Sequence, residues 1–218
     1  MIQYAIFDVD GTLLDSMSIW EETTEQLLRK KGIVPEDGLI DTIMHMSMEE
    51  GSAYVKEKYQ MPETAEEILT GIVEFVEKFY REKAGFKKDV RVLLDELKKR
   101  NVKMVVATSG SAELAGAALE RLGVRDYFLR IFSCGEVGAG KTRPDIFLKA
   151  AETLGSTPEE TWVFEDAVHA VRTAKQSGFK VTVIYDESSK KDWEEIKSLG
   201  DVVLEESDSY MKFFDKQG

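Results

Sequence analysis

Hydrophobic positions along the chain follow two patterns, and the change between them lies near residue 85. Beyond it, short apolar runs rich in β-branched residues alternate with longer segments whose apolar positions recur every three to four residues. The short apolar runs predict buried strands, and the longer periodic segments predict amphipathic helices. We expect strands at residues 102–108, 129–133, 161–166, 180–185 and 201–204. We expect helices at residues 90–100, 111–123, 143–155, 167–178 and 193–200.

Strands that alternate with helices are typical of a parallel sheet covered on both faces. A further apolar run at residues 4–7 reads as a strand of the same sheet, although a long helical stretch separates it from the others. The predicted fold class is therefore α/β, a doubly wound parallel sheet with a Rossmann-like core. In such sheets ligands bind beyond the carboxyl ends of the strands.

The stretch between these strands, residues 17–84, has helical periodicity almost throughout. Ser18 with Glu21, and Thr64 with Glu67, have the spacing of a capping box at a helix start. We therefore predict an inserted all-helical cap domain at residues 17–84, and a core domain formed by residues 1–16 and 85–218.

The composition of the chain indicates which partners and which cellular compartment to expect. A net charge of −12 and a pI near 4.8 argue against a nucleic-acid or anionic-membrane surface. No apolar run approaches the ~20 residues that span a bilayer, and no basic region followed by an apolar one indicates a signal peptide. The single cysteine, Cys134, excludes an internal disulfide and fits a reducing compartment. We expect a cytoplasmic monomer that binds neither nucleic acid nor membrane.

Two carboxylates, Asp8 and Asp10, follow the first predicted strand. Residues two apart in an extended segment point to the same side, although a turn at Gly11 can redirect the second. Carboxylates this close repel, and one pKa rises unless a cation lies between them. A hard divalent cation such as Mg²⁺, which prefers oxygen ligands, suits the pair.

Other strand ends and loops carry groups that could hold a phosphate. Thr108 and Ser109 offer hydroxyls, and the backbone around Gly110 offers N–H groups at a helix start. Lys141 is a cation just before a predicted helix, and residues 164–167, "FEDA", end another strand with a second acidic pair. Each feature alone is common at helix ends and on surfaces. Together, on the ligand-binding edge of one sheet, they predict a site for a phosphate group and a metal ion.

The motifs "DVDGT", "TSG", "GKTRPDIF" and "FEDA", in this order, resemble those of the haloacid dehalogenase-like hydrolases. The helical insertion after the first motif is similar to the subgroup that contains β-phosphoglucomutase and many small sugar-phosphate phosphatases. The resemblance implies a Mg²⁺-dependent phosphatase. Its substrate would be a small phosphate monoester, such as a sugar phosphate or a similar metabolite, hydrolysed through an aspartyl-phosphate.

The resemblance also implies roles for the acidic residues. Asp8 would be the nucleophile, and Asp10 would be the general acid for the leaving group and then the base for water. Asp8, the backbone carbonyl of Asp10, and Asp166 would hold the Mg²⁺, with Glu165 left open as a further ligand.

The same resemblance implies that Thr108 and Lys141 bind the phosphate oxygens, and Ser109, next to Thr108, is a further candidate. The chain departs from the pattern where Thr142 replaces a common proline and where Ala167 and Ala170 replace a serine and a glycine. These departures leave the chemistry intact and bear on the fine geometry around the metal.

For substrate contacts within the cap we single out residues 44–54, where Met44, Met46 and Met48 could form an adaptable apolar wall. Met44 and Met48 are the candidate substrate contacts. In β-phosphoglucomutase the comparable loop carries an arginine that helps to hold a second phosphate. An approximate alignment puts Met48 at that position, and residues 17–84 hold 15 acidic and 8 basic residues. Both features favour a phosphatase over a mutase.

The sequence leaves several alternatives open. A phosphomutase of the β-phosphoglucomutase type is the nearest, and a dehalogenase is disfavoured because Asp10 has no role in that chemistry. A phospho-acceptor receiver domain also uses Asp, Thr, Lys and Mg²⁺, but its acceptor lies on a later strand and it lacks a cap of this size. A binding protein built on an inactive hydrolase fold is the remaining non-enzymatic alternative.

Overall fold

The computed structural model describes residues 2–43, 46 and 48–216. The chain divides into two compact units, one formed by Met1–Asp15 with Ala84–Gly218 and the other by Ser16–Lys83. The first unit contains a six-stranded sheet and the second consists of helices in its described residues.

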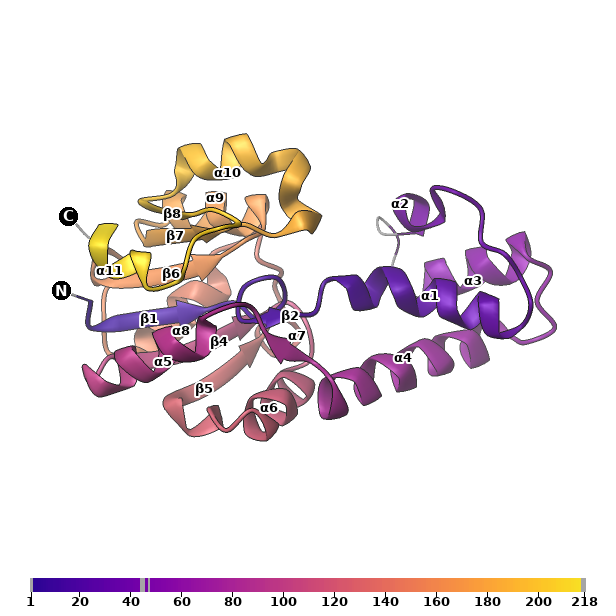
Figure 1. Ribbon diagram of the computed structural model, residues 1–218, viewed down its shortest axis with the longest axis horizontal. Helices are drawn as coiled ribbons and strands as arrows, with labels where there is room; N and C mark the ends of the chain where they lie inside the picture. The colour runs from indigo at the N-terminus through magenta and orange to yellow at the C-terminus, as the bar shows by residue number, and fades with distance from the viewer. Residues whose placement is uncertain (1, 44–45, 47, 217–218) are drawn as a thin grey trace. The chain divides into compact units, whose positions relative to one another are not determined.

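Six parallel strands form the sheet of the first unit, in the order β5-β4-β1-β6-β7-β8. The first strand of the chain thus lies between two strands that follow much later, as Figure 1 shows. The predicted α/β fold with a doubly wound parallel sheet is confirmed. The strands are β1 (Tyr4–Phe7), β4 (Lys103–Thr108), β5 (Phe128–Ser133), β6 (Thr161–Glu165), β7 (Lys180–Ile184) and β8 (Val202–Leu204).

Helices of the first unit cover one face of this sheet with a continuous apolar cluster. Phe147 of α8, Val171 of α9 and Ile196 of α10 are buried in it with Ile6 and Val163 of the central strands. The helices of the unit are α5 (Val90–Lys99), α6 (Ala112–Arg121), α7 (Cys134–Val137), α8 (Asp145–Leu154), α9 (Val168–Gln176), α10 (Trp193–Leu199) and α11 (Lys212–Lys216). Short 3-10 turns are η1 (Arg125–Tyr127), η2 (Pro158–Glu160) and η3 (Glu187–Asp192).

The opposite face of the sheet is covered by aromatic side chains. Because successive strand residues alternate between faces, Phe7 and Phe164 point away from the cluster that contains their neighbours, and their rings stack at 4.3 Å. Phe213 of α11 packs on this face, with its ring 4.9 Å from that of Phe164 and 5.1 Å from that of Trp162. Both faces of the central strands are therefore buried, as a parallel sheet requires.

Replacing Phe213 with alanine should lower the free energy of unfolding by about 3–5 kcal/mol, because the ring is fully buried and its loss leaves a cavity. Denaturant unfolding followed by circular dichroism measures the change. Phe214→Ala, at the half-buried neighbouring position, is the control and should cost clearly less. An equal effect of the two substitutions would contradict the anchoring role of α11.

A short antiparallel ribbon lies where the chain leaves and re-enters the first unit. It is formed by β2 (Leu14–Asp15) and β3 (Gly85–Phe86), and the backbone N–H of Lys87 extends it by donating to Leu13 O at 3.0 Å. The strands have two residues each, so they are too short to show a periodicity in sequence.

The second unit contains α1 (Ser18–Lys30), α2 (Leu39–Ile43), α3 (Met48–Lys58) and α4 (Ala65–Glu82). Five residues spread along the unit form its buried apolar cluster: Leu28, Leu39, Val55, Met61 and Ile68. Helix α4 packs against both α1 and α3, so the unit has a core of its own.

The two predicted capping boxes have different outcomes. The one at Thr64 is confirmed: its hydroxyl accepts from the N–H of Glu67 at 3.1 Å, and its N–H donates to the Glu67 carboxylate at 2.8 Å. The one at Ser18 is wrong, because Met17 is the residue before the helix and makes no side-chain cap. Met17 already has helical backbone angles, so Ser18 lies inside the first turn.

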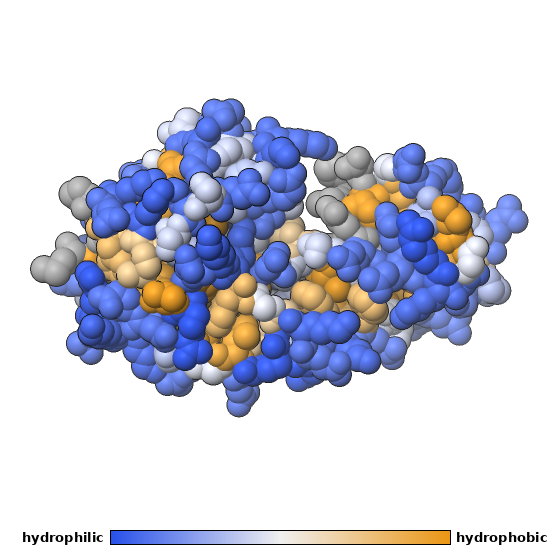
Figure 2. Space-filling model, viewed as in Figure 1, coloured by the Kyte–Doolittle hydropathy of each residue, from blue (hydrophilic) through white to orange (hydrophobic). Residues whose placement is uncertain are grey.

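Figure 2 shows a surface dominated by hydrophilic residues on the face in view, with apolar residues gathered in smaller groups. Among the described residues, each helix is too short or too polar to cross a bilayer.

Candidate active site

The ends of two neighbouring strands bring three carboxylates together. Asp8 directly follows β1, and Glu165 and Asp166 lie at the end of β6, which pairs with β1 in parallel. The N–H of Asp8 continues this pairing by donating to Phe164 O at 3.1 Å. One oxygen of each carboxylate lies within 4.8 Å of the other two, and all three side chains are buried. We call Asp8, Glu165 and Asp166 the carboxylate cluster.

Lys141 enters the cluster from the loop between α7 and α8, and it is only 3% exposed. Its ammonium donates to Asp8 Oδ1 and to Glu165 Oε1. Burial alone would lower the pKa of Lys141, but the charges of Asp8 and Glu165 outweigh it and raise that pKa above its usual value. The lysine therefore stays charged and carries a fixed positive charge next to Asp8.

Glu165 uses both of its oxygens within the protein. Oε1 receives the Lys141 ammonium, and Oε2 accepts from the N–H groups of Asp166 and Ala167 at 3.1 and 3.2 Å. Burial raises the pKa of Glu165 to about 7, opposed by Lys141 and supported by Asp8. Glu165 is thus held in place as a partner of the lysine.

Asp166 lies close to several other carboxylates. Burial, followed by the charges of Asp8, Glu165 and Asp186, raises the pKa of Asp166 well above its usual value. The hydroxyl of Thr12 donates to its Oδ1 at 3.1 Å. Three buried carboxylates facing one ammonium leave negative charge that a further cation would offset. A donor set made only of oxygens fits a hard divalent ion such as Mg²⁺.

The second aspartate of the first motif points elsewhere. Gly11 adopts a positive φ of 83°, and the N–H groups of Leu13 and Leu14 both donate to Val9 O, so the chain turns sharply after β1. Asp10 Oδ2 lies 3.6 Å from the position that a Cβ on Gly110 would occupy. The turn therefore directs the Asp10 carboxylate toward the loop after β4, while its backbone stays beside Asp8.

The two predicted hydroxyl residues, Thr108 and Ser109, lie at the end of β4 and at the start of that loop. Thr108, at the end of β4, is buried, and its Oγ1 accepts from the N–H of Gly110 at 2.9 Å. Ser109 is exposed, with its hydroxyl 3.9 Å from the Cys134 sulfur. Strand β4 is the other neighbour of β1, so the ends of three adjacent strands contribute to one edge of the sheet.

Comparison with known proteins identifies the family, since residues 5–184 match the haloacid dehalogenase-like hydrolases. The chain belongs to that family. The predicted membership of this hydrolase family, and with it the prediction of an enzyme, is confirmed.

Curated relatives that match most of the chain include phosphatases. The chain is 28% identical to the phosphorylated carbohydrates phosphatase of Thermotoga maritima, over 82% of this chain and 83% of that protein. It is 27% identical to hexitol phosphatase A of Escherichia coli, over 82% of this chain and 81% of that protein.

Solved structures share the fold over nearly the whole chain. A Thermotoga maritima protein provisionally assigned as a β-phosphoglucomutase superimposes with a TM-score of 0.84 at 23% identity, covering 98% of this chain and 99% of that one. CbbY from Rhodobacter sphaeroides, solved with xylulose-1,5-bisphosphate, has a TM-score of 0.74 at 22% identity, with 94% of each chain covered. At these identities the likeness establishes a common haloacid dehalogenase-like fold.

The predicted substrate contacts lie in the helical unit. Met44 is outside the described residues, and Met48 is the first residue of α3. Their role stays a prediction.

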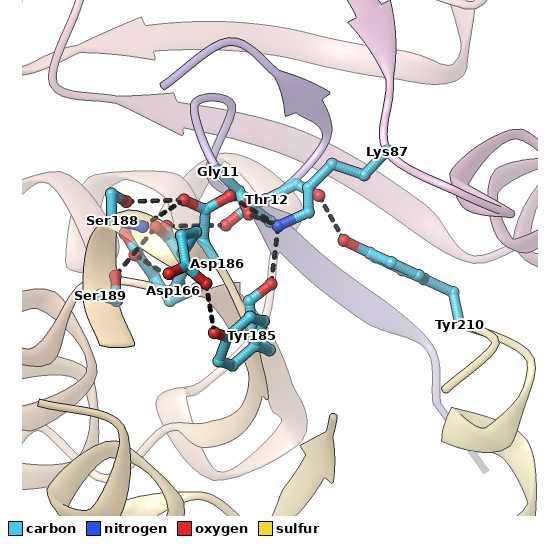
Figure 3. A network of polar contacts seen from close by, with 11 residues as sticks. Gly11, Thr12, Lys87, Asp166, Tyr185, Asp186, Ser188, Ser189 and Tyr210 are labelled. Carbon is cyan, nitrogen blue, oxygen red and sulfur yellow. Dashed lines mark hydrogen bonds and ion pairs between the residues drawn. The ribbon is translucent and has the colours of Figure 1, made fainter. Parts of the chain in front are cut away.

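Five residues around the carboxylate cluster did not stand out in the sequence: Thr12, Lys87, Asp186, Ser189 and Tyr210. Figure 3 shows them in one network with Asp166. Thr12 is the last residue of the "DVDGT" motif, and its place in that motif was the only feature of the sequence that could have pointed to one of the five. The other four lie far from it along the chain, and only the fold brings them near.

Proposed function

We propose that this haloacid dehalogenase-like hydrolase is a Mg²⁺-dependent phosphatase that hydrolyses a small phosphate monoester through an aspartyl-phosphate on Asp8. The observation that carries the proposal is the position of the Asp8 carboxylate, buried against the Lys141 ammonium and within 4.8 Å of the Asp166 carboxylate. A carboxylate that attacks a phosphate dianion meets charge repulsion, and positive charge fixed at that point lowers it.

In the first proposed step, an oxygen of Asp8 attacks phosphorus and the bond to the ester oxygen breaks. Asp10 gives its proton to the leaving oxygen, so the alcohol departs neutral. In the second step Asp10 takes a proton from water, whose oxygen attacks the phosphorus and frees Asp8. Two acids beside each other on one turn can divide attack and proton transfer in this way. The turn at Gly11 supports this division, because it separates the two carboxylates.

Phosphate oxygens in this proposal are bound by Lys141, Thr108 and Ser109. The ammonium of Lys141 is already held between Asp8 and Glu165, so it is positioned without further reorganisation. The loop after β4 adds hydroxyls and the N–H groups that precede α6.

Mg²⁺ would be held by Asp8, Asp166 and the backbone carbonyl of Asp10. When bound it offsets the charge of the phosphate and of the surrounding carboxylates. We assign Glu165 to the lysine rather than to the metal, because its Oε1 receives Lys141 and its Oε2 receives two backbone N–H groups.

The proposed substrate class is supported by curated relatives, whose names refer to phosphorylated carbohydrates and to hexitols. We propose a sugar phosphate, a polyol phosphate or a metabolite of similar size. We further propose that the helical unit, Ser16–Lys83, acts as a cap that excludes water and contributes residues 44–54 to substrate recognition.

The test is phosphorus NMR of purified protein with Mg²⁺ and a panel of sugar, polyol and nucleotide monophosphates. We expect stoichiometric release of free phosphate from at least one member. A chelator should remove the activity, Mg²⁺ should restore it, and Ca²⁺ should not, because its looser coordination misplaces the nucleophile.

Two outcomes would contradict the proposal. Full activity in excess chelator would exclude the metal role. Interconversion of sugar-phosphate isomers without matching phosphate release, stimulated by a trace of bisphosphate, would replace the phosphatase with a mutase.

A further inference from the structure

Lys87 is a nearly buried cation outside the carboxylate cluster. Its side chain is 15% exposed and that of its ion-pair partner, Asp186, is 10% exposed, with 2.7 Å between Nζ and Oδ2. The ammonium also donates to the backbone oxygens of Gly11 at 2.8 Å and Tyr185 at 2.7 Å. An ammonium has three N–H donors, so each of them is used.

The acceptors of Lys87 belong to two loops on the ligand-binding edge of the sheet. Gly11 lies in the turn that follows Asp10, whereas Tyr185 and Asp186 follow the end of β7. Figure 3 shows the lysine reaching between them. Tyr210 fixes the same turn one residue further on, since its hydroxyl donates to Thr12 O at 2.7 Å.

Both loops contact Asp166. From the first, the Thr12 hydroxyl donates to Asp166 Oδ1 at 3.1 Å, and from the second, the Ser189 hydroxyl donates to Oδ2 at 3.4 Å. The second contact depends on Asp186, whose Oδ1 accepts from the N–H and the hydroxyl of Ser188 at 3.1 and 2.6 Å and so shapes the turn. Each oxygen of Asp166 is thus reached from one of the two loops that Lys87 joins.

We infer that Lys87 and Asp186 are a positioning pair: by joining the Gly11–Thr12 turn to the Ser188–Ser189 turn they orient the Asp166 carboxylate and raise the affinity of the carboxylate cluster for a divalent cation. This rests on the proposed role of Asp166 as a metal ligand. Partners that orient a ligand in this way are worth about 10- to 100-fold in metal affinity or activity when lost.

The sign of the effect separates positioning from simple electrostatics. Lys87 is a positive charge near a cation site, so its charge alone weakens cation binding. Removing that charge should tighten binding if Lys87 acts only through its field. It should weaken binding if the lysine orients Asp166.

The experiment measures Mn²⁺ binding to the full chain by electron paramagnetic resonance of the free ion, in the absence of substrate. Mn²⁺ serves as the probe because it accepts the same oxygen ligands. The Lys87→Met variant keeps the aliphatic stem and removes the three donors. We expect its dissociation constant for Mn²⁺ to rise about tenfold or more.

Three further variants test the interpretation. Lys87→Met/Asp186→Asn avoids leaving a buried unpaired carboxylate, and it should bind Mn²⁺ as weakly as the single variant. Lys190→Met removes an exposed lysine of the same turn, which pairs with Glu187, and it should bind like the natural chain. Asp166→Asn removes a proposed metal ligand, so the Mn²⁺ that this variant still binds measures weak binding elsewhere on the protein.

Unchanged or tighter Mn²⁺ binding in both Lys87 variants would overturn the inference, and so would absence of specific binding in the natural chain. Phosphate release is measured separately. A chain whose Mn²⁺ affinity depends on Lys87 but which hydrolyses no ester would contradict the proposed phosphatase and retain the positioning pair.

Discussion

Replacing Asp8 with asparagine should lower the rate of phosphate-ester hydrolysis by a factor of about 10³ or more, because an amide cannot form the acyl-phosphate on which the two-step reaction depends. The side chain keeps its size, and its oxygen can still accept from Lys141. The fold should therefore survive, which a thermal melt beside the activity assay checks.

The matched control is Asp126→Asn, which makes the same substitution in an exposed ion pair with Lys98. It should retain the activity of the natural chain. Activity of Asp8→Asn above roughly one hundredth of the natural rate would remove Asp8 as the nucleophile.

Replacing Lys141 with methionine should strongly lower the free energy of unfolding, besides abolishing phosphate binding. It leaves Asp8 and Glu165 buried without their shared cation, and breaking a buried ion pair typically costs about 3–5 kcal/mol of unfolding free energy. Urea unfolding of the metal-free protein measures this loss.

The loss should depend on pH in a definite direction. The pKa of Glu165 is already raised to about 7 in the folded chain, from 4.5, and removing Lys141 raises it further. A carboxyl whose folded pKa is raised stabilises the protein fully below its unfolded value and loses that contribution as pH rises through the folded value. The deficit of Lys141→Met should therefore be smaller at pH 5 than at pH 8.

The control for this prediction is Lys197→Met, which removes a lysine paired with the exposed Glu194. Surface pairs contribute ~0–1 kcal/mol, so little change is expected. Equal stability of Lys141→Met and the natural chain at pH 8 would contradict the assignment of Lys141 as the counter-charge of the cluster.

The fold was predictable where hydrophobic pattern and β-branching act locally. The predicted strands at 102–108, 161–166 and 180–185 match β4, β6 and β7 to within a residue at each end. By contrast, the two-residue strands β2 and β3 and the helices α7 and α11 are too short for a period to be visible. They exist because the rest of the fold supports them, as the buried ring of Phe213 illustrates for α11.

The site was predictable to the extent that parallel strands end at the same edge of a sheet. That rule alone indicates that residues after β1, β4 and β6 lie near one another. It does not give the order of the strands, so it could not indicate that residues after β7 also reach Asp166. The contact between Tyr210 and Thr12, 198 residues apart, has no local pattern at all.

Strand β1 is synthesised long before the two strands that flank it in the sheet, β4 and β6. Thr12 and its partner Asp166 are 154 residues apart, an interval that a ribosome covers in roughly 8–30 s. The second neighbour of β1, β6, begins only at Thr161. Until β4 is made, from Lys103, the apolar residues Tyr4–Phe7 have neither neighbouring strand, and an unpaired apolar strand is prone to aggregate. The helical unit, Ser16–Lys83, is contiguous in sequence and can fold during this interval. The nascent chain can therefore carry a folded helical unit and an unpaired apolar strand at the same time.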